Sequence, residues 1–403
     1  MRILVLNCGS SSIKSQVIET SAEQIEASKD VVASRVTLER IGTPDAILTA
    51  IDCDGHRSRT TRPVSGFDEG LRVSLEAHRC DLSAITGVGH RIVHGGERFS
   101  QSTIMTPEVV GAIEDLIGLA PLHNPHNLKG YYAAAKLLPE AQNVAVFDTA
   151  FHRSLPSNAF LYGIPYAYYT RDRIRRYGFH GLSHRYVSYR YAQVHERTQA
   201  DYKFITCHLG NGASVCAIRH GKSVDTSMGF TPLEGLMMGT RSGDLDPGAI
   251  ATMMAQEENS IHDIEAILNR QSGLLGLSGL SQDMRTLLEH RANGSGRAAL
   301  AIDVFTYRIK KYIGAYFAVL NGADALIFTG GIGENAGAIR EEACAGLEAL
   351  GIVIDPERNA AAAGREGCIS SDSSSVAVWV IPTNEELLIA RDTFRCIYGL
   401  PQP

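Results

Sequence analysis

The 403-residue chain lacks several patterns that would assign it to a specialised class of protein. Its eight cysteines are scattered from Cys8 to Cys396, and no two of them form a CxxC pair. This spacing is unlike a disulfide or zinc framework and is typical of buried thiols in a reducing compartment. No apolar run approaches the roughly 18 residues that a membrane-spanning helix needs. The apolar residues 3–6 are too few for a secretory signal and lead into polar Asn7. We therefore expect a cytoplasmic protein.

Charge is scarce as well. Lysine, arginine, aspartate and glutamate make up 20% of the chain, and the formal net charge is −6. This balance provides no electrostatic basis for binding nucleic acid or an anionic membrane. A polyanionic substrate would therefore have to be held by a local cluster of cations. The hydrophobic share of 44% is typical of soluble globular proteins.

The length exceeds what one ordinary hydrophobic core holds, so the chain is expected to form two domains. We expect the first over residues 1–150 and the second over residues 151–385, with the boundary near residues 151–156. A C-terminal helix of about residues 386–403 is expected to pack against the first domain.

Two parts of the chain follow one plan. Residues 3–6 and 13–18 are apolar runs typical of strands, and a turn rich in glycine and serine joins them. The same order recurs at residues 203–207 and 215–218, and each half later has an apolar run that ends in a double glycine, at Gly95-Gly96 and Gly330-Gly331. We interpret this as an internal duplication of an α/β unit, with chance similarity between glycine-rich turns as the alternative.

Helical patterns lie between these landmarks. Thr106, Pro107 and Glu108 are typical of a helix start, because they supply a cap, an early proline and an early acid. Residues 297–320 have apolar side chains at helical spacing and predict the longest helix. Strands that alternate with helices predict a mainly parallel or mixed sheet covered by helices. The serine-rich residues 370–375 predict an exposed connection.

The two glycine-rich turns suit phosphate binding. Backbone N–H groups can approach a phosphate only where side chains are small, and residues 7–12 and 208–212 meet this condition. Neither turn has the GxxxxGK[ST] pattern, so the chain is outside the P-loop family. Lys14 follows the first turn and could reach a phosphate. Taken singly, either segment could be a plain tight turn.

A third glycine-rich segment permits a different interpretation. Residues 331–336 match GxGxxA after an apolar run, and Asp355 follows about 20 residues later, as in a dinucleotide-binding fold. A nicotinamide-dependent dehydrogenase is therefore an alternative. It would leave the two earlier turns and the arginines below unexplained.

Several polar side chains could handle an anionic substrate. Arg91 and Arg241 lie among small residues, where a guanidinium can present its donors to a carboxylate or phosphate. Asp148 ends an apolar run, at the position where α/β sheets place their sites. The alternatives are structural ion pairs for the arginines and a helix cap for Asp148. His123 and His180 have similar settings but could be ordinary core histidines, and Glu385 is either a helix-start residue or a Mg²⁺ ligand.

Taken together, these segments resemble the acetate kinase family, and the resemblance covers essentially the whole chain. The segments that carry it are Leu6-Asn7-Cys8-Gly9-Ser10-Ser11-Ser12-Ile13-Lys14, Gly178-Phe179-His180-Gly181-Leu182-Ser183-His184, residues 208–214, Met238-Gly239-Thr240-Arg241-Ser242-Gly243-Asp244, residues 330–335 and Thr383-Asn384-Glu385-Glu386. The resemblance implies an α/β protein with two duplicated ribonuclease-H-like domains flanking an active-site cleft, the second of which binds the nucleotide. It also implies a homodimer that uses ATP and ADP as co-substrates.

The resemblance implies a role for each matching position. Mg²⁺, for which Mn²⁺ can substitute, would be bound by Asn7 and Glu385. The ATP phosphates would be bound by Lys14, Ser10, Ser12, His208, Leu209, Gly210, Asn211 and Gly212. The adenosine would be contacted by Asp283, Met284, Arg285, Gly331, Ile332, Gly333, Glu334 and Asn335. The acyl substrate would be bound by Arg91, Val93, Leu122, His123, Phe179 and Pro232. The family's catalytic acid corresponds to Asp148, the transition state would be stabilised by His180 and Arg241, and Arg91 would also take part in catalysis.

The implied chemistry needs no general base. Acetate has a pKa near 4 to 5, by analogy with aspartate and glutamate, and therefore arrives ionised. The difficulty is to bring one anion close to another, which positioned cations can do. We therefore expect Asp148 to orient Arg91 or a metal-bound water instead of moving a proton.

Two further alternatives stay open at this stage. Relatives that prefer propionate tend to carry a smaller residue where Val93 stands, so a propionate kinase is the nearest alternative. A chaperone-type ATPase on the same fold is more remote, because no peptide-binding region follows Glu385.

Overall fold

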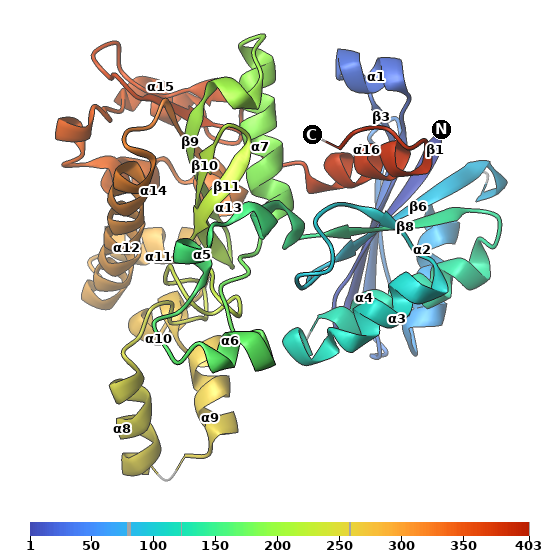
Figure 1. Cartoon of the computed structure of the whole chain (residues 1–403), viewed down its shortest axis with the longest axis horizontal. Helices are drawn as coiled ribbons and strands as arrows, with labels where there is room; N and C mark the ends of the chain where they lie inside the picture. The colour runs from blue at the N-terminus through green and yellow to red at the C-terminus, as the bar shows by residue number, and fades with distance from the viewer. Residues whose placement is uncertain (79–81, 122, 258, 403) are drawn as a thin grey trace. The chain divides into compact units, whose positions relative to one another are not determined.

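The computed structural model describes residues 1–78, 82–121, 123–257 and 259–402 (Figure 1). The chain forms two compact units. The first comprises Met1–Phe151 together with Asn384–Pro403, and the second comprises His152–Thr383. Glu385, expected in the second domain, therefore lies in the first compact unit.

The first unit is built on an eight-stranded sheet. Its strands are β1 (Arg2–Cys8), β2 (Ser12–Glu19), β3 (Val31–Glu39), β4 (Ala46–Ile51), β5 (Arg57–Arg62), β6 (Ile85–Ile92), β7 (Thr103–Ile104) and β8 (Gln142–Phe147). They lie in the order β5-β4-β3-β2-β1-β6-β8-β7. The β1–β5 meander is antiparallel, whereas β6 runs parallel to both β1 and β8.

The second unit is built on a six-stranded sheet in the order β11-β10-β9-β12-β14-β13. Its strands are β9 (Lys203–Leu209), β10 (Ala213–Arg219), β11 (Lys222–Thr226), β12 (Ala325–Thr329), β13 (Gly367–Cys368) and β14 (Ala377–Val380). The first three form an antiparallel meander, and β12 runs parallel to both β9 and β14.

Both sheets contain the same five-strand core. The order β3-β2-β1-β6-β8 in the first unit corresponds to β11-β10-β9-β12-β14 in the second, and every pairing has the same direction. The two glycine-rich turns join equivalent hairpin strands, and the double glycines follow the equivalent strands β6 and β12. The duplication expected from the sequence is therefore confirmed, and the fold class is α/β with two sheets.

Helices cover both faces of the first sheet. The unit contains α1 (Ala22–Ala27), α2 (Phe67–Ala77), α3 (Pro107–Asp115), α4 (Asn124–Leu137) and α16 (Glu385–Ile397). Leu4, Leu6 and Val88 point toward α2 and α4, because they share a buried cluster with Leu71 and Ala133.

The opposite face of the first sheet packs against α16. Because side chains alternate along a strand, Gly87 and Gly89 of β6 lie on this face. A Cβ atom at Gly89 would lie 2.7 Å from Cγ2 of Ile389 and would also overlap Oγ1 of Thr393. The glycines therefore allow α16 to lie directly against the strand.

The remaining helices belong to the second unit. They are α5 (Ser157–Phe160), α6 (Ala167–Asp172), α7 (Gly181–Val194), α8 (Pro247–Glu257), α9 (Ile261–Ala266), α10 (Gly273–Ser278), α11 (Met284–Ala292), α12 (Gly296–Leu320), α13 (Gly330–Asn335), α14 (Gly337–Cys344) and α15 (Pro356–Ala361). None of the described helices combines the length and apolar character required to cross a membrane.

The units exchange one helix each. Helix α7 follows the last strand of the first unit but packs on β9 and β12 of the second. Helix α16 follows the last strand of the second unit but packs on β1, β6 and β8 of the first, as its red ribbon shows in Figure 1. Because β1 and β6 correspond to β9 and β12, the two helices occupy equivalent places.

Most local expectations agree with the structure. The helix expected at Pro107 is α3, and the side chain of Thr106 caps it by accepting a hydrogen bond from the N–H of Val109. The longest helix is α12, as expected. The serine-rich connection is more ordered than expected, because the hydroxyl of Ser374 donates to the carbonyl of Gly351 at 2.8 Å.

Candidate active site

In the first unit, several expected site residues share one face of the sheet. Asn7 and Lys14 are direct partners in the β1–β2 ladder, so both side chains lie on the same face. Val5 pairs with Gly89 on the parallel strand β6. Asn7 and Arg91 each follow two residues later, and therefore lie on this face too. It is the face covered by α16.

Arg91 and Asp148 form a bidentate ion pair at the ends of β6 and β8. Nε of Arg91 donates to Oδ1 of Asp148 at 3.0 Å, and Nη2 donates to Oδ2 at 2.6 Å. The Asp148 side chain is only 2% exposed, whereas that of Arg91 is 20% exposed. Burial opposes the charge on Arg91, but Asp148 and Glu385 outweigh it and raise the pKa of the guanidinium. Arg91 is therefore a positioned cation, and the exposed part of its guanidinium can bind an anion.

Glu385 joins this pair from the start of α16. One of its carboxylate oxygens lies 3.9 Å from Nε of Arg91. Burial raises the pKa of Glu385 to about 7; Arg91 opposes this shift, and Asp148 and Glu386 add to it. Asn7, Asp148 and Glu385 supply the amide and carboxylate oxygens that Mg²⁺ prefers as ligands. The carboxylates of Asp148 and Glu385 share one arginine, so a bound divalent cation would reduce the repulsion between them. These residues therefore fit Mg²⁺.

Two asparagines of α4, which sequence reasoning missed, hold the neighbouring loops. Asn127 donates from Nδ2 to the carbonyl of Cys8 at 2.9 Å and accepts at Oδ1 from the N–H of Val93 at 3.0 Å. Asn124 exchanges a similar pair of bonds with the backbone of His94. Asn127 therefore links the first glycine-rich turn to the strand end that carries Val93. The signal was available in the run Asn124-Pro125-His126-Asn127, next to His123.

The turn between β1 and β2 is tight. The N–H of Gly9 donates to the carbonyl of Ser12 at 2.9 Å, and Ser10 lies exposed between them. His123 precedes α4 at its N-cap position. The expected substrate residue Leu122 lies outside the described residues.

In the second unit, the equivalent turn is surrounded by basic side chains. The N–H of Gly210 donates to the carbonyl of Gly212 at 3.0 Å, which closes the turn after His208 and Leu209. A Cβ atom at Gly212 would lie 3.3 Å from Nε2 of His180 and 3.5 Å from Nη1 of Arg241. A larger side chain at position 212 would crowd both His180 and Arg241.

His180 reaches this position through an unusual backbone. It has φ +56° and ψ +23°, the left-handed region, and directly precedes α7. Such a conformation in a residue other than glycine costs free energy and is concentrated at functional sites. Its ring stacks on that of His208, with 4.2 Å between the centroids.

Arg241 differs from Arg91 because it has no carboxylate partner among the described residues. Its Nη1 donates to the carbonyl of Pro232 at a long 3.4 Å. Burial lowers the pKa of Arg241. A largely buried guanidinium with unused donors beside a glycine-rich turn is a preformed site for an anion.

A second missed group anchors the loop that carries Pro232 and Arg241. Arg176 donates from Nη1 to the carbonyls of Thr226, Ser227 and Met228. Its Nη2 donates to Glu234, which also accepts from the hydroxyl of Tyr162. The charge pattern alone gave no indication of this, because the partners are about 60 residues apart.

A cavity of about 580 Å³ lies beside the turn in the second unit. This volume is within the range of small-ligand sites. Eight of its lining residues were expected to contact the nucleotide, namely Gly210, Asn211, Asp283, Met284, Arg285, Gly331, Ile332 and Asn335. Three were not, namely Gln282, Leu288 and Ala336.

Of the residues expected to contact the adenosine, Gly333 and Glu334 are not among those that line this cavity. The carboxylate of Glu334 accepts from the N–H groups of Gly330 at 2.9 Å and Thr383 at 3.1 Å, so it ties two strand ends together. Asp355, the acid of the dinucleotide alternative, caps α15 by accepting from the N–H of Arg358. This capping role explains the presence of Asp355, so the acid need not be interpreted as a ligand of a nucleotide ribose.

The residues expected to bind the acyl substrate are divided between the units. Val93 and His123 belong to the first, and Phe179 and Pro232 belong to the second. Phe179 is buried, and its carbonyl accepts a hydrogen bond from Nε2 of His152 at 3.0 Å.

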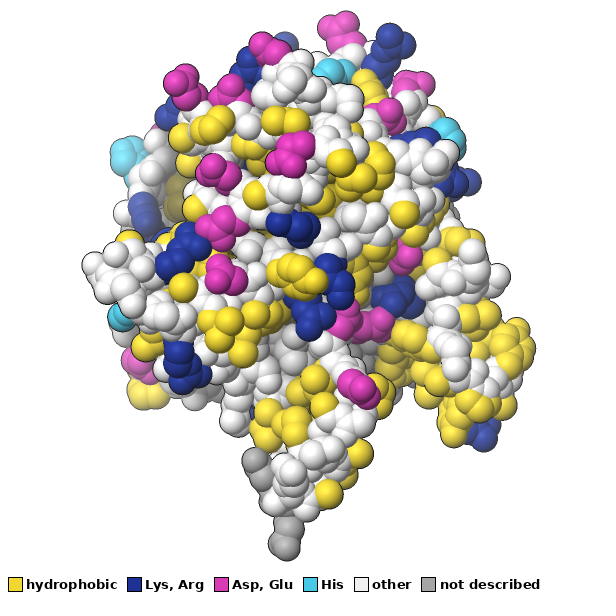
Figure 2. Space-filling view, turned by 90° about the vertical axis from the view of Figure 1, so that its left-hand side faces the viewer, with side chains coloured by type: hydrophobic (Ala, Val, Ile, Leu, Met, Phe, Trp, Pro, Cys, Tyr) yellow, Lys and Arg dark blue, Asp and Glu magenta, His cyan; other side chains and the backbone are white. Residues whose placement is uncertain are grey.

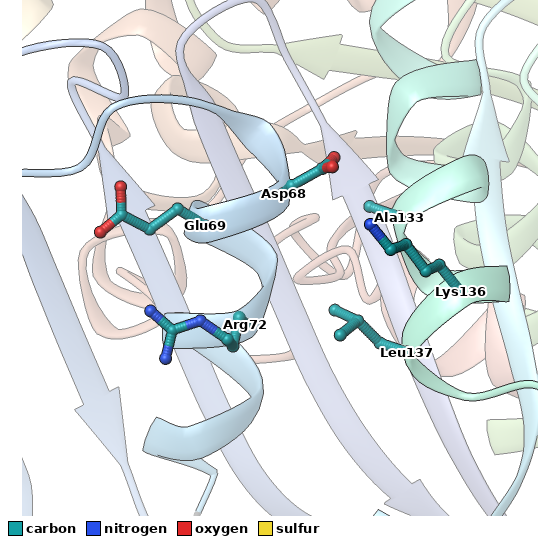
Figure 3. A pocket seen from close by; sticks show the side chains of 6 residues that line it. All are labelled: Asp68, Glu69, Arg72, Ala133, Lys136 and Leu137. Atoms are coloured by element: carbon teal, nitrogen blue, oxygen red, sulfur yellow. The ribbon is translucent and has the colours of Figure 1, made fainter.

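A smaller cavity of about 280 Å³ lies between α2 and α4 in the first unit. Figure 3 shows Asp68 of α2 and Lys136 of α4 pointing toward one another across it. None of the expected site residues is among those that line it.

The fold and the site define a class of protein. Two copies of one α/β unit, a glycine-rich turn beside a buried arginine and a nucleotide-sized cavity are the features of a kinase built on duplicated ribonuclease-H-like units. The family model described as the acetokinase family matches residues 2–391, and the chain belongs to that family.

Individual relatives are similar over their full length. The acetate kinase of Solibacter usitatus is 52% identical, with 100% of both chains covered. A crystal structure of acetate kinase from Porphyromonas gingivalis superposes with a TM-score of 0.92 at 43% identity, covering 98% of this chain and 99% of that one. A propionate kinase from Francisella tularensis gives a TM-score of 0.90 at 39% identity, covering 99% and 100%.

Proposed function

We propose that the chain catalyses the reversible, Mg²⁺-dependent transfer of a phosphoryl group from ATP to acetate, giving acetyl phosphate and ADP. The observation that carries this proposal is Arg241, a partly buried guanidinium that no described carboxylate neutralises, beside the turn at Gly212. The 580 Å³ cavity next to the turn suits the nucleoside of ATP.

The acceptor is assigned to Arg91 of the first unit. Its guanidinium is held by Asp148 through two hydrogen bonds, so that its direction is fixed before a carboxylate arrives. The acetate oxygen attacks the γ-phosphorus directly, the bond to the ADP oxygen breaks, and no proton is transferred. Asp148 therefore acts by orienting Arg91.

The donor set of Asn7, Asp148 and Glu385 supports a Mg²⁺ site, with Mn²⁺ as an acceptable replacement. When bound, the ion would neutralise charge that develops on the phosphate oxygens. The remaining contacts with the phosphates come from side chains and backbone groups of the chain. Lys14 and the first turn would bind phosphate, and His180 and Arg241 would stabilise the transition state by donating hydrogen bonds to its oxygens.

Propionate is the second candidate acceptor, because the similar structure from Francisella tularensis is a propionate kinase. One methylene group changes binding by only about 1–3 kcal/mol. We therefore propose that propionate is used less efficiently than acetate.

We also propose that the two compact units act as the two domains, and that the protein is a cytoplasmic homodimer that binds neither nucleic acid nor membrane. A dimer would bury apolar surface. Figure 2 shows hydrophobic side chains in several groups between charged ones on one face of the molecule. Exposed large apolar side chains of the second unit include Ile164, Tyr166, Tyr168, Ile261, Leu280 and Tyr307.

An acyl-hydroxamate assay with ATP and Mg²⁺ tests the reaction across acetate, propionate and butyrate. We expect product in the order acetate, propionate, butyrate. Binding of NAD without binding of ATP would favour a dehydrogenase instead. Stimulation of ATP hydrolysis by unfolded peptide, without acyl phosphate, would favour a chaperone-type ATPase.

A further inference from the structure

A chain of hydrogen bonds runs behind His180 through the core of the second unit. Nδ1 of His180 lies 3.0 Å from the hydroxyl of Ser214, which lies 2.8 Å from Nε2 of His184. Nδ1 of His184 in turn lies 2.7 Å from the hydroxyl of Thr206. Ser214, His184 and Thr206 are fully buried. Each of the three side chains behind His180 therefore has to find its hydrogen-bond partner within the protein.

Thr206, at the far end of this hydrogen-bond chain, determines which group donates and which accepts at each step. The only partner of the Thr206 hydroxyl among the described residues is His184. If Thr206 accepted from His184, its own hydrogen would be buried without an acceptor, which is costly. Thr206 therefore donates to Nδ1 of His184, Nε2 of His184 donates to Ser214, and Ser214 donates to Nδ1 of His180. In this direction every hydrogen in the chain has an acceptor.

The surroundings of the two histidines favour neutral rings. Burial holds the pKa of His184 well below its usual range, and the neighbouring His152 and His208 lower it further. His180 faces the ring of His208 on one side and the cationic Arg241 near Gly212. Because Ser214 donates to Nδ1 of His180, that nitrogen carries no proton and this ring is neutral as well.

We propose that Thr206, His184 and Ser214 hold His180 as a neutral imidazole with its proton on Nε2. Ser214 is the positioning residue in direct contact with His180. Nε2 and the adjacent Cε1 are the ring atoms that lie beside Gly212, so a proton on Nε2 provides a donor at the phosphate-binding turn. The inference rests on the proposed function only in that a transferring phosphoryl group would receive this hydrogen bond.

Nitrogen-15 NMR of the full-length protein with labelled histidines tests the tautomer directly. The signals of His180 are assigned by their loss in His180→Gln. At pH 7 we expect Nδ1 of His180 to be unprotonated and Nε2 to be protonated. Ser214→Ala should give a mixture of tautomers, because the donor to Nδ1 is gone. Ser223→Ala is the matched control, since it removes a buried serine–histidine bond of 2.8 Å at His152 and leaves the chain intact.

Thr206→Val provides a second variant if Ser214→Ala does not fold. It removes the hydroxyl that sets the direction of the chain, so it should also mix the tautomers of His180, and Thr206→Ser should restore the wild-type signals. A proton on Nδ1 of wild-type His180 at pH 7 would overturn the proposal. So would tautomers in both Ser214→Ala and Thr206→Val that match the wild type.

Kinetics supply the second readout. Ser214→Ala should lower kcat for acyl phosphate formation roughly ten-fold, the usual effect of one misdirected hydrogen bond, with little change in KM for ATP. Its pH profile should also change, whereas that of Ser223→Ala should not. An unchanged kcat in Ser214→Ala would contradict the proposal. Absence of acyl phosphate with the wild-type protein would overturn the proposed function alone, because the NMR result does not depend on activity.

Discussion

Arg91 and Arg241 look alike in the sequence but differ in their surroundings. Arg91 is held by two bonds to Asp148, whereas Arg241 meets, among the described residues, only carbonyl and sulfur acceptors at long distances. A guanidinium that is already neutralised can select and orient a second carboxylate. One that is buried without a counter-charge attracts a polyanion more strongly. This difference agrees with the proposed acceptor and transition-state roles.

The role of Asp148 can be tested by Asp148→Asn. We expect kcat to fall about 10- to 100-fold, because the charge-assisted bonds that direct Arg91 are weakened. The pH profile should keep its shape, since no proton is moved. Loss of an obligatory deprotonation in the variant, together with a solvent isotope effect in the wild type, would contradict this role.

Val93→Ala tests the preference for acetate. The shorter side chain should raise kcat/KM for propionate relative to acetate by roughly ten-fold, because it makes room for about one methylene group. Val93→Ile, which adds a methylene group, should move the ratio in the opposite direction. An unchanged ratio in both variants would mean that Val93 does not contact the acyl chain.

His78 provides a test of stability against pH in the first unit. Its ring nitrogens lie 2.9 Å from the hydroxyl of Ser15 and 2.7 Å from that of Ser34, and burial lowers its pKa to about 4. Below pH 6.5 the unfolded chain binds a proton that the folded state does not, so stability is lost as the pH falls toward 4. His78→Gln should reduce this loss by about 1.4 kcal/mol per pH unit near pH 5.

The measurement is the free energy of unfolding in urea at pH 5, 6 and 7. The exposed His262→Gln is the control and should leave the slope unchanged. Equal slopes for His78→Gln and the wild type would show that His78 titrates normally.

For single residues, the sequence predicted the site best where a charged or histidine side chain stands in an unusual sequence context. Arg91, Asp148, His180 and Arg241 stand beside glycines or at strand ends, and each has a specific place in the structure. Asn127 and Arg176 could not be found in this way, because their importance lies in which backbone atoms they meet. Those partners come together only in the folded chain.

At the scale of elements, β6 and α16 form the contact that matters most for the first unit. Gly89 allows the helix to approach, and Glu385 at its N-terminus faces Arg91 as a result. Gly89→Ala should therefore both destabilise the unit and displace Glu385. We expect a loss of about 1–3 kcal/mol, typical of an overpacked core, together with weaker Mg²⁺ binding.

Gly111→Ala on α3 is the matched control for Gly89→Ala. A Cβ atom at Gly111 would meet nothing within 4 Å, so the variant should be stabilised by about 0.5–1 kcal/mol through its higher helix propensity. Urea unfolding and Mg²⁺ titration would separate the two variants. A Gly89→Ala protein as stable as the wild type would show that α16 does not pack closely on β6.

The hairpins and the helices α3 and α12 could be predicted because their signals are local. Apolar runs, caps and helical spacing can be recognised within a few neighbouring residues. The packing of α16 on the first unit was expected, whereas the packing of α7 on the second sheet could not be predicted from local signals. An amphipathic pattern shows that a helix has an apolar face, but it does not say which of two similar sheets will cover that face.

For the whole molecule, the position of α16 predicts how the chain responds to truncation. The helix is anchored by a buried pair between Arg391 and Asp30 at 2.6 Å and by a bond from Ser102 to Asp392 at 3.0 Å. A chain that ends at Thr383 would expose the sheet face beneath it. We expect hydrogen exchange in β1, β6 and β8 to become fast, while β9, β10 and β12 stay protected.

A peptide of residues 384–403 added to the truncated chain is the control. It should restore slow exchange in the first sheet, because it supplies the missing helix. Unchanged protection of β6 and β8 in the truncated chain would contradict the packing of α16 on them.

The helix exchange also has a consequence for the order in which the protein can be completed as it is synthesised. The second unit has all of its parts once residue 383 has left the ribosome, because α7 is made before the sheet that it covers. The first unit is translated earlier, yet it is completed only by α16, which is translated after the whole of the second unit. The half of the protein that is made first is therefore the half that can finish folding last, and during that interval its uncovered sheet face exposes apolar surface that can aggregate.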